Sequence, residues 1–272
     1  LFGSNQFGGG VSNAHNGVMA YEHAYQGVEA RKAYFFMGDA MVCMGSGIKA
    51  ARTQEVRTSV NQCLANGEVT YGLSGHTYRL TNNLSDKNID WAYHDNVGYI
   101  FPQNESVTLR KAKQTGAWRE LEVTASDKPV TKEIFSLWVS HGTTPQHEDY
   151  CYIIMPDKPL SYFTDKKFEN EIKIIVNSEQ IQAISNENKR QYAAVFYEPG
   201  EIRFAEDLVV AVNKKVIIYI EKKDKQYEIA VADPLYKEQS LQLSMNGEQI
   251  NIVFPSGDYS GSSVIKHITE KH

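Results

Sequence analysis

Short runs of apolar residues alternate with polar turn residues along almost the whole chain. The runs are rich in β-branched and aromatic residues, and the chain has 16 Tyr and 11 Phe in total. Such side chains suit pleated, half-buried surfaces. Turn signals recur at intervals of about 8 to 12 residues, which is typical of an antiparallel sandwich. The pattern therefore predicts an all-β protein.

Three turn signals predict tight hairpins. Asn-Gly is a strong hairpin signal because both central positions of the turn need a positive φ. The signals and the runs that they separate are Gly38-Asp39 between 34–37 and 42–44, Asn66-Gly67 between 60–64 and 68–71, and Asn246-Gly247 between 241–244 and 249–254.

The last hundred residues predict a meander of consecutive strands. Its candidate strands are 172–176, 181–185, 193–197, 208–212, 216–221 and 227–232. One earlier stretch is ambiguous, because Val56, Val60 and Cys63 fall at helical spacing. The β-branched residues of the same stretch favour a strand, and we predict a strand there. Two prolines and a polar stretch at 156–165 mark the best boundary. We therefore expect domains at 1–160 and 161–272.

Composition excludes several classes of function. The net charge of the 272-residue chain is −5, and no basic face indicates nucleic acid or an anionic membrane surface. No apolar run reaches the roughly 20 residues of a membrane helix. The three cysteines, Cys43, Cys63 and Cys151, fit neither a disulfide framework nor a metal site. We interpret them as small apolar core residues, although one pair could bridge in an oxidising compartment.

An aromatic cluster surrounds one imidazole in the middle of the chain. It contains Trp91, His94, Tyr99 and Phe101. Aromatic faces can stack on sugar rings and histidine can donate to hydroxyls, but such side chains also pack in cores. The sequence leaves both alternatives open, with core packing favoured.

No metal or nucleophile motif stands out. His141 and His147 lie too far apart for one strand face, so a structural turn is the better interpretation. Aspartates at 39, 86, 90 and 95 could bind calcium through oxygen, but they lack the spacing of a calcium loop. Each is more often a turn residue. We therefore assign no metal-binding residues and no definite cofactor. A structural calcium ion stays an open alternative.

Several segments together resemble polysaccharide lyase family eight, which includes chondroitinases AC and ABC, hyaluronate lyases and xanthan lyases. The segments occur in the order and at about the spacing of that family. They are Ala30–Asp39 with Val42–Ile48, Thr58–Gln62, Trp91–His94 with Val97–Phe101, Val139–Gly142 with Pro145 and Tyr150–Tyr152, and finally Ile174–Ile184 with Ala193–Phe196. The resemblance implies a large, supersandwich-like antiparallel β-sandwich followed by a smaller carboxy-terminal β-sandwich.

The resemblance also implies lyase chemistry on a uronic-acid-containing glycosaminoglycan of the chondroitin or hyaluronan type. In the family, an amino-terminal α/α toroid supplies the Asn, His, Tyr and Arg of the active site, and that toroid has no counterpart in this sequence. We therefore expect the chain to brace a toroid and line the substrate cleft, and to be inactive alone. A non-catalytic carbohydrate-binding β-sandwich is the alternative.

Catalytic residues stay unassigned, because the family's acidic residue aligns near Asn5, where this chain has no acid. As substrate-binding candidates we name Asn5 and Gln6 in the amino-terminal loop, and Trp91 and His94. The expected partners are an anionic polysaccharide and the toroid. The chain has no initiator Met and opens in the middle of a pattern, so it reads as part of a longer, secreted or periplasmic bacterial protein.

Overall fold

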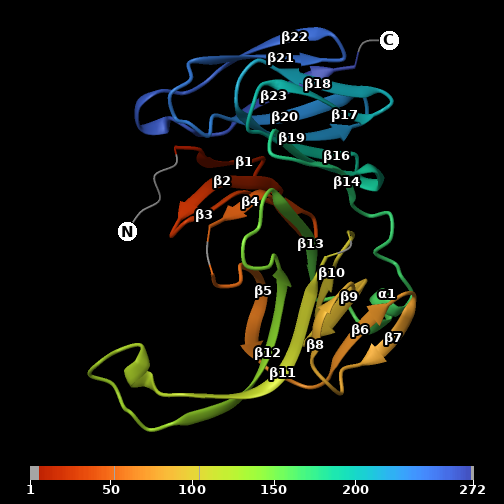
Figure 1. Cartoon of the computed structure of the whole chain (residues 1–272). Coiled ribbons are helices and arrows are strands. Elements are labelled where there is room, and N and C mark those ends of the chain that lie inside the picture. Colours follow the sequence, from red (N-terminus) through yellow and green to blue (C-terminus); the bar gives the residue numbers. More distant parts are fainter. Residues whose placement is uncertain (1–5, 52, 104, 271–272) are drawn as a thin grey trace. The chain divides into compact units, whose positions relative to one another are not determined.

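The protein is built from antiparallel β-sheets (Figure 1). The computed structural model describes residues 6–51, 53–103 and 105–270. The described residues fall into two compact units, each assembled from separate stretches of the chain. The first comprises residues 6–51, 145–153 and 166–270, and the second comprises residues 53–103, 105–144 and 154–165. The prediction of an all-β protein is confirmed.

The first unit begins with strands that pair in chain order. They are β1 (Gly8–Ser12), β2 (Gly17–Tyr25), β3 (Val28–Met37) and β4 (Ala40–Ala50), and β13 (Glu148–Pro156) lies next to β4. Gly38 and Asp39 make the turn between β3 and β4, where Met37 pairs with Ala40. The hairpin predicted at this position is confirmed.

Two further sheets of the first unit form a carboxy-terminal sandwich. One has the order β14 (Lys173–Asn177), β15 (Ile181–Asn186), β16 (Gln191–Phe196), β19 (Val216–Lys223), β20 (Gln226–Ala232) and β23 (Val264–Thr269). The other has the order β17 (Gly200–Ala205), β18 (Leu208–Val212), β21 (Ser240–Met245) and β22 (Glu248–Val253). Their facing side chains, which include Phe196, Ile218 and Leu243, form a continuous apolar core.

The prediction of a simple meander in this region is wrong in its connectivity. The six predicted strands all exist, but β16 pairs with β19 and not with the strand that follows it. The hairpin of β17 and β18 crosses to the opposite sheet, because its buried residues, Phe204, Leu208 and Val210, complete the core from that side. The Asn246-Gly247 hairpin between β21 and β22 is confirmed, with φ of +51° and +85° at the two turn residues.

The second unit contains two four-stranded sets. One has the order β10 (Val97–Ile100), β9 (Trp91–His94), β6 (Val69–Leu73) and β7 (His76–Arg79), and the other has the order β5 (Arg57–Leu64), β12 (Val130–Ser140), β11 (Val107–Gly116) and β8 (Leu84–Lys87). Its helix α1 (Leu160–Thr164) buries Phe163, and it has a short 3-10 turn at Trp118–Glu120. The first unit has two such turns among its described residues, at Glu187–Lys189 and Gly257–Tyr259. No helix of the described residues is long and apolar enough to cross a membrane.

The hairpin predicted at Asn66-Gly67 is wrong. Residues 57–64 do form a strand, as predicted, but β5 pairs with β12 while β6 pairs with β7 and β9. The Asn66 amide N–H donates to His94 Nε2 at 3.0 Å, and its side chain donates to Asp95 at 2.9 Å. These contacts fix a crossing between sheets where the local sequence alone would favour a hairpin.

None of the three cysteines forms a disulfide. Cys43 and Cys151 are fully buried, which confirms their prediction as core residues. Cys63 is partly exposed, because its strand lies at the edge of its sheet.

Candidate functional site

The substrate-binding residues named from the sequence lie in different surroundings. Asn5 lies outside the described residues. Gln6 is exposed two residues before the start of β1. Trp91 and His94 lie on β9 with exposed fractions of 3% and 1%.

The contacts of Trp91 and His94 are those of core residues. The Trp91 ring packs on Phe163, with 5.9 Å between ring centroids, and His94 stacks on Phe135 at 4.3 Å. The indole also fills the space over Gly72, where a β-carbon would meet the ring. Burial lowers the pKa of His94, and nearby Lys111 lowers it further against the opposing effect of Asp95. This burial favours the core-packing alternative, and a role of either residue in binding substrate stays a prediction.

The sites considered for metals hold ordinary polar contacts. His141 is buried against Thr58, with 2.8 Å between Nε2 and Oγ1, and His147 contacts Glu179 at 2.6 Å. Asp95 accepts from Asn66, and Asp90 accepts from the Gly75 amide at 3.1 Å. Within residues 6–51, 53–103 and 105–270, no group of three or more His, Cys, Asp or Glu side chains could hold a metal ion.

The two faces of the β2–β4 sheet have different surroundings. Side chains alternate between faces along a strand. One face, with Ala33, Phe35 and Met44, lies toward the carboxy-terminal sandwich, because its Arg31 lies over the ring of Tyr197 with 5.3 Å to the centroid. The opposite face presents half-buried and exposed side chains beside two buried phenols, Tyr150 and Tyr152. We call it the tyrosine face, and it consists of Met19, Tyr21, His23, Lys32, Tyr34, Phe36, Tyr150 and Tyr152.

Neighbouring phenols form the centre of the tyrosine face. Tyr34 pairs with Met19 on β2 and with Cys43 on β4, and its ring stacks on that of Tyr21 with centroids 6.4 Å apart. The phenols of Tyr21 and Tyr150 also influence the pKa of Tyr34. Burial is the main cause that raises the pKa of Tyr34 and that of Tyr150 above the ordinary value of a phenol. The two phenols therefore stay neutral hydrogen-bonding groups at physiological pH.

Glycine makes room for this cluster. A β-carbon at Gly45 of β4 would overlap the ring of Tyr150. Tyr150 in turn stacks on Tyr152, with ring centroids 5.7 Å apart and planes inclined by 21°. Tyr152 also lies near Cys43, whose pKa burial raises to about 12. Sequence position 45 thus has to be glycine for the rings from β13 to reach β3.

A cation and an imidazole border the phenols. Lys32 lies opposite Tyr21 on β2 and opposite Gly45 on β4. Burial lowers the pKa of Lys32, and it lowers that of His23 as well, with a further contribution from the Lys32 charge. Phe36 and Met19 are 44% and 46% exposed at the edge of the face. Aromatic rings that can stack on sugars, neutral hydroxyls and one ammonium group suit an anionic carbohydrate.

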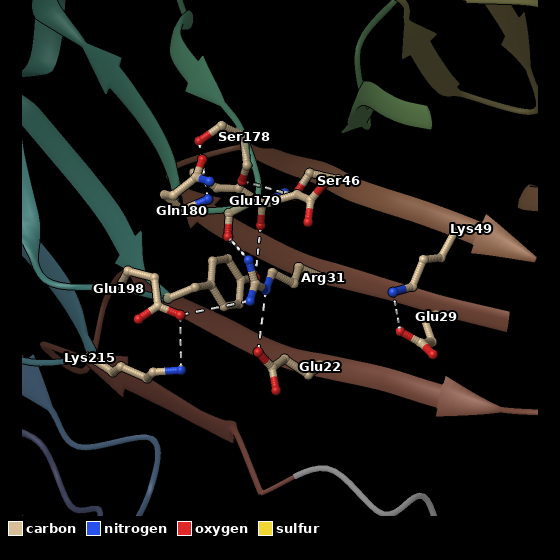
Figure 2. A network of polar contacts seen from close by, with 12 residues as sticks. Glu22, Glu29, Arg31, Ser46, Lys49, Ser178, Glu179, Gln180, Glu198 and Lys215 are labelled. Atoms are coloured by element: carbon tan, nitrogen blue, oxygen red, sulfur yellow. Dashed lines mark hydrogen bonds and ion pairs between the residues drawn. The ribbon is translucent and has the colours of Figure 1, made fainter. Parts of the chain in front are cut away.

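An ion-pair network around Arg31 lies on the opposite face of β3 (Figure 2). The Arg31 guanidinium binds Glu22 at 3.3 Å and lies 3.9 Å from Glu198. It also donates to the backbone carbonyl of Glu179, in the turn that precedes β15. Lys215 adds a second cation to Glu198 at 3.2 Å. Arg31 thereby joins β2 and β3 to the carboxy-terminal sandwich within the first unit.

Comparison with known proteins places these elements in a family. Residues 2–167 match the super-sandwich domain of polysaccharide lyase family 8, and residues 173–242 match its C-terminal β-sandwich domain. The chain belongs to polysaccharide lyase family 8. The family resemblance and the fold class predicted from the sequence are therefore confirmed.

Members of family 8 from several bacteria are similar to this chain. Chondroitinase-AC of Pedobacter heparinus is 31% identical over 96% of this chain and 38% of its own length. A hyaluronate lyase of Thermasporomyces composti is 24% identical over 87% of this chain and 30% of its own length. A chondroitinase AC lyase, solved in complexes with oligosaccharides, superposes with a TM-score of 0.90 at 29% identity, over 98% of this chain and 40% of that one. The chain thus spans about two fifths of the length of these two chondroitinases.

The sequence contained one signal for the tyrosine face that we did not use. In the run Ala30–Met37 of this family 8 chain, Lys32, Tyr34 and Phe36 alternate with Arg31, Ala33 and Phe35. That alternation separates two sheet faces. The contribution of Tyr150 and Tyr152 has no local signal, because β13 reaches β4 from a distant part of the chain.

Proposed function

We propose that the chain is the carboxy-terminal part of a polysaccharide lyase that cleaves uronic-acid-containing glycosaminoglycans by β-elimination. In this proposal it supports an amino-terminal α/α toroid and lines one wall of the substrate cleft. The observation that carries the proposal is the tyrosine face, which presents stacking rings, neutral phenols and the Lys32 ammonium on the side away from the carboxy-terminal sandwich. Membership of family 8 supports the reaction class.

The family resemblance assigns the catalytic groups of this reaction to the toroid and assigns none of them to this chain. The carboxylate of a uronic acid makes the neighbouring C5 proton acidic, and an Asn of the toroid would help to neutralise that carboxylate. His or Tyr would remove the proton, and Tyr would then protonate the departing glycosidic oxygen, which leaves an unsaturated uronate. This is acid–base catalysis with electrostatic stabilisation. The tyrosine face would hold the sugar chain in register and attract its charge through Lys32.

The protein would meet such substrates outside the cytoplasm, and we propose a secreted or periplasmic location. The alternative function is a carbohydrate-binding β-sandwich module without a catalytic partner. Both functions require glycan binding by the tyrosine face. They differ in whether the natural protein carries a helical domain ahead of this chain and releases unsaturated product.

The first test is binding and turnover by this chain. Affinity electrophoresis in gels that contain chondroitin sulfate should retard the chain. Lys32→Met should weaken the retardation by roughly tenfold, since a charge-assisted contact is lost. Lys173→Met is the matched control, because Lys173 is 65% exposed on the carboxy-terminal sandwich, away from the tyrosine face. Equal effects of the two variants would contradict the role of this face.

Turnover is followed by the ultraviolet absorbance of unsaturated uronate, with a complete family enzyme as positive control. We expect no product from this chain alone. Product from the chain joined to its natural upstream sequence would support the lyase. Binding without product from that longer protein would favour the non-catalytic module.

A further inference from the structure

A row of polar side chains crosses the six-stranded sheet of the carboxy-terminal sandwich. Gln191 of β16 lies opposite Glu221 of β19, which in turn lies opposite Glu228 of β20. Side chains that lie directly opposite each other in an antiparallel pair share one face of the sheet. The neighbours along the strands, Ile220 and Ile229, belong to the apolar core of the sandwich. Because side chains alternate between faces, the polar row lies on the face away from that core.

The two carboxylates of this row repel each other. Like charges directly opposite each other destabilise a pair of strands. The side chain of Glu221 is only 16% exposed, so water screens its charge poorly. Its ion-pair partner among the described residues is Lys223 at 3.5 Å, a side chain that is 60% exposed. No described Lys, Arg or His side chain forms an ion pair with Glu228. The pair therefore keeps a net negative charge.

The turn between β1 and β2 reaches both carboxylates through Asn13. Its Oδ1 accepts from the backbone amides of His15 at 3.2 Å and Asn16 at 2.9 Å, which fixes the orientation of the side-chain amide. Its Nδ2 donates to Glu221 Oε2 at 3.2 Å and to Glu228 Oε1 at 2.8 Å. This neutral group holds the carboxylates at one place and leaves their charge in place.

Two buried oxygens beside the carboxylates have no hydrogen-bond partner among the described residues. They are Oε1 of Gln191, which is 5% exposed, and the hydroxyl of Tyr219, which is 0% exposed. Tyr219 precedes Glu221 by two residues on β19 and so shares its face. Burial raises the pKa of Tyr219, and the charges of Glu221 and Glu228 raise it further. A buried oxygen without a donor costs free energy, and a bound cation would satisfy it.

We propose that this polar row binds a calcium ion. The protein ligands are all oxygens, and they come from Glu221, Glu228, Gln191 and Tyr219. Calcium takes roughly six to eight oxygen ligands in flexible geometry, with carboxylates and amide carbonyls among them, and water would supply the rest. Zinc and copper favour nitrogen and sulfur ligands, which this row does not offer. Magnesium demands a near-ideal octahedron, which side chains fixed along one sheet row match poorly.

The charge of the row sets the strength of binding that we expect. Two carboxylates balance the charge of one calcium ion, and the described residues offer no third His, Cys, Asp or Glu ligand. With Lys223 nearby, the dissociation constant should be on the order of 10⁻³ M, which is typical of extracellular calcium modules. The ion would hold the β1–β2 turn on the carboxy-terminal sandwich through Asn13. The inference goes beyond the proposed function, because no residue of the tyrosine face takes part.

The first test measures unfolding of the chain in urea, after treatment with a chelator, with and without calcium. A ligand that binds only the folded chain raises the folding equilibrium constant by one plus the ratio of its concentration to its dissociation constant. Calcium at about ten times the dissociation constant should therefore raise it about tenfold. Magnesium at the same concentration is the control and should have little effect.

Glu228→Gln separates a calcium ligand from a merely structural carboxylate. Without calcium the variant should be at least as stable as the original chain, because the repulsion with Glu221 is gone and Asn13 keeps an acceptor. Calcium should stabilise it far less, since calcium affinity follows the number of charged ligands. Glu201→Gln is the matched control, because Glu201 is exposed on β17 of the other sheet. This control should keep the tenfold rise.

The second test uses terbium, which binds at calcium sites and emits light when a nearby phenol is excited. Emission should saturate as terbium is added and should fall when calcium displaces it. Tyr219→Phe should lose most of the emission. Tyr227→Phe is the matched control, because its hydroxyl is also buried without a partner but belongs to the apolar core on the other face. It should emit like the original chain.

Three results would overturn the calcium site. They are an unchanged urea midpoint in calcium, equal stabilisation of Glu228→Gln and the original chain, and equal terbium emission from Tyr219→Phe and Tyr227→Phe. A calcium effect that Glu228→Gln loses and Glu201→Gln keeps, with emission that requires Tyr219, supports the site. No measurement here involves a glycan, so failure of the calcium site leaves the proposed function untouched.

Discussion

Arg31 and Lys32 are neighbours in β3, yet their side chains serve opposite faces of the sheet. Arg31 lies over the ring of Tyr197 in the carboxy-terminal sandwich, whereas Lys32 lies opposite Tyr21 on the tyrosine face. Strand β3 therefore both contacts the carboxy-terminal sandwich and presents the candidate binding groups. A substitution of Arg31 would therefore affect the tyrosine face through β3.

Replacing Arg31 by Met should destabilise the first unit. The change leaves Glu22 and the carbonyl of Glu179 without their donor, and both charged side chains are largely shielded, with exposed fractions of 24% and 22% for Arg31 and Glu22. We expect a loss of about 1–3 kcal/mol in the free energy of unfolding, measured by urea titration. Lys49→Met is the control, since its pair with Glu29 is exposed and should cost less than about 1 kcal/mol. Equal losses would contradict an anchoring role.

Acid should destabilise the second unit through His94. Burial lowers the pKa of this imidazole in the folded chain, so below about pH 6.5 the unfolded chain binds a proton that the folded chain resists. The contribution of His94 is therefore fully present above that pH and is lost as the pH falls toward the folded pKa. In His94→Gln, the free energy of unfolding should therefore fall less steeply as the pH is lowered below about 6.5. His76→Gln, at an exposed position, should leave that decline unchanged.

How far the sequence predicts this fold depends on the range of the contacts involved. The β3–β4 and β21–β22 hairpins follow from turn chemistry within a few residues. Asn66-Gly67 carries the same local signal, but the contacts of Asn66 with His94 and Asp95 override it. The crossing of β17 and β18 to the opposite sheet likewise depends on where their apolar residues find a core.

The candidate site was harder to predict for a related reason. Trp91 and His94 attract attention as an aromatic and an imidazole in one short run, but packing against Phe163 and Phe135 buries both. Tyr34 belongs to the run that carries the family resemblance, and its alternation with Phe35 could be read locally. Which of the two faces stays open depends on the carboxy-terminal sandwich, and no local pattern contains that information.

Alkali should destabilise the first unit through the buried thiol of Cys43. Burial raises its pKa to about 12 in the folded chain, above the ordinary value of about 8.5. The thiol therefore contributes stability that is present below the unfolded pKa and is lost as the pH rises toward about 12. Urea midpoints measured from about pH 8 upward should fall less steeply in Cys43→Ala than in the original chain. A parallel decline in both proteins would show that Cys43 carries none of the effect.

The glycine at position 98 should be required for the packing that buries Trp91. A β-carbon there would overlap the ring of Phe163, which contacts both Trp91 and Tyr93. Helix α1 would have to move to relieve the overlap, because Phe163 is fully buried. Gly98→Ala should therefore lower the free energy of unfolding by about 1–3 kcal/mol, as expected for an overpacked core.

Gly116→Ala is the matched control for this substitution, since the nearest side-chain atom would lie 3.7 Å away and the backbone there does not require glycine. Its effect should stay within about 0.5 kcal/mol. Chondroitin binding by Gly98→Ala at a temperature where it stays folded gives the second measurement. If Trp91 is a core residue, the affinity stays unchanged while stability falls. A loss of chondroitin affinity in Gly98→Ala would instead support Trp91 as a substrate-binding residue.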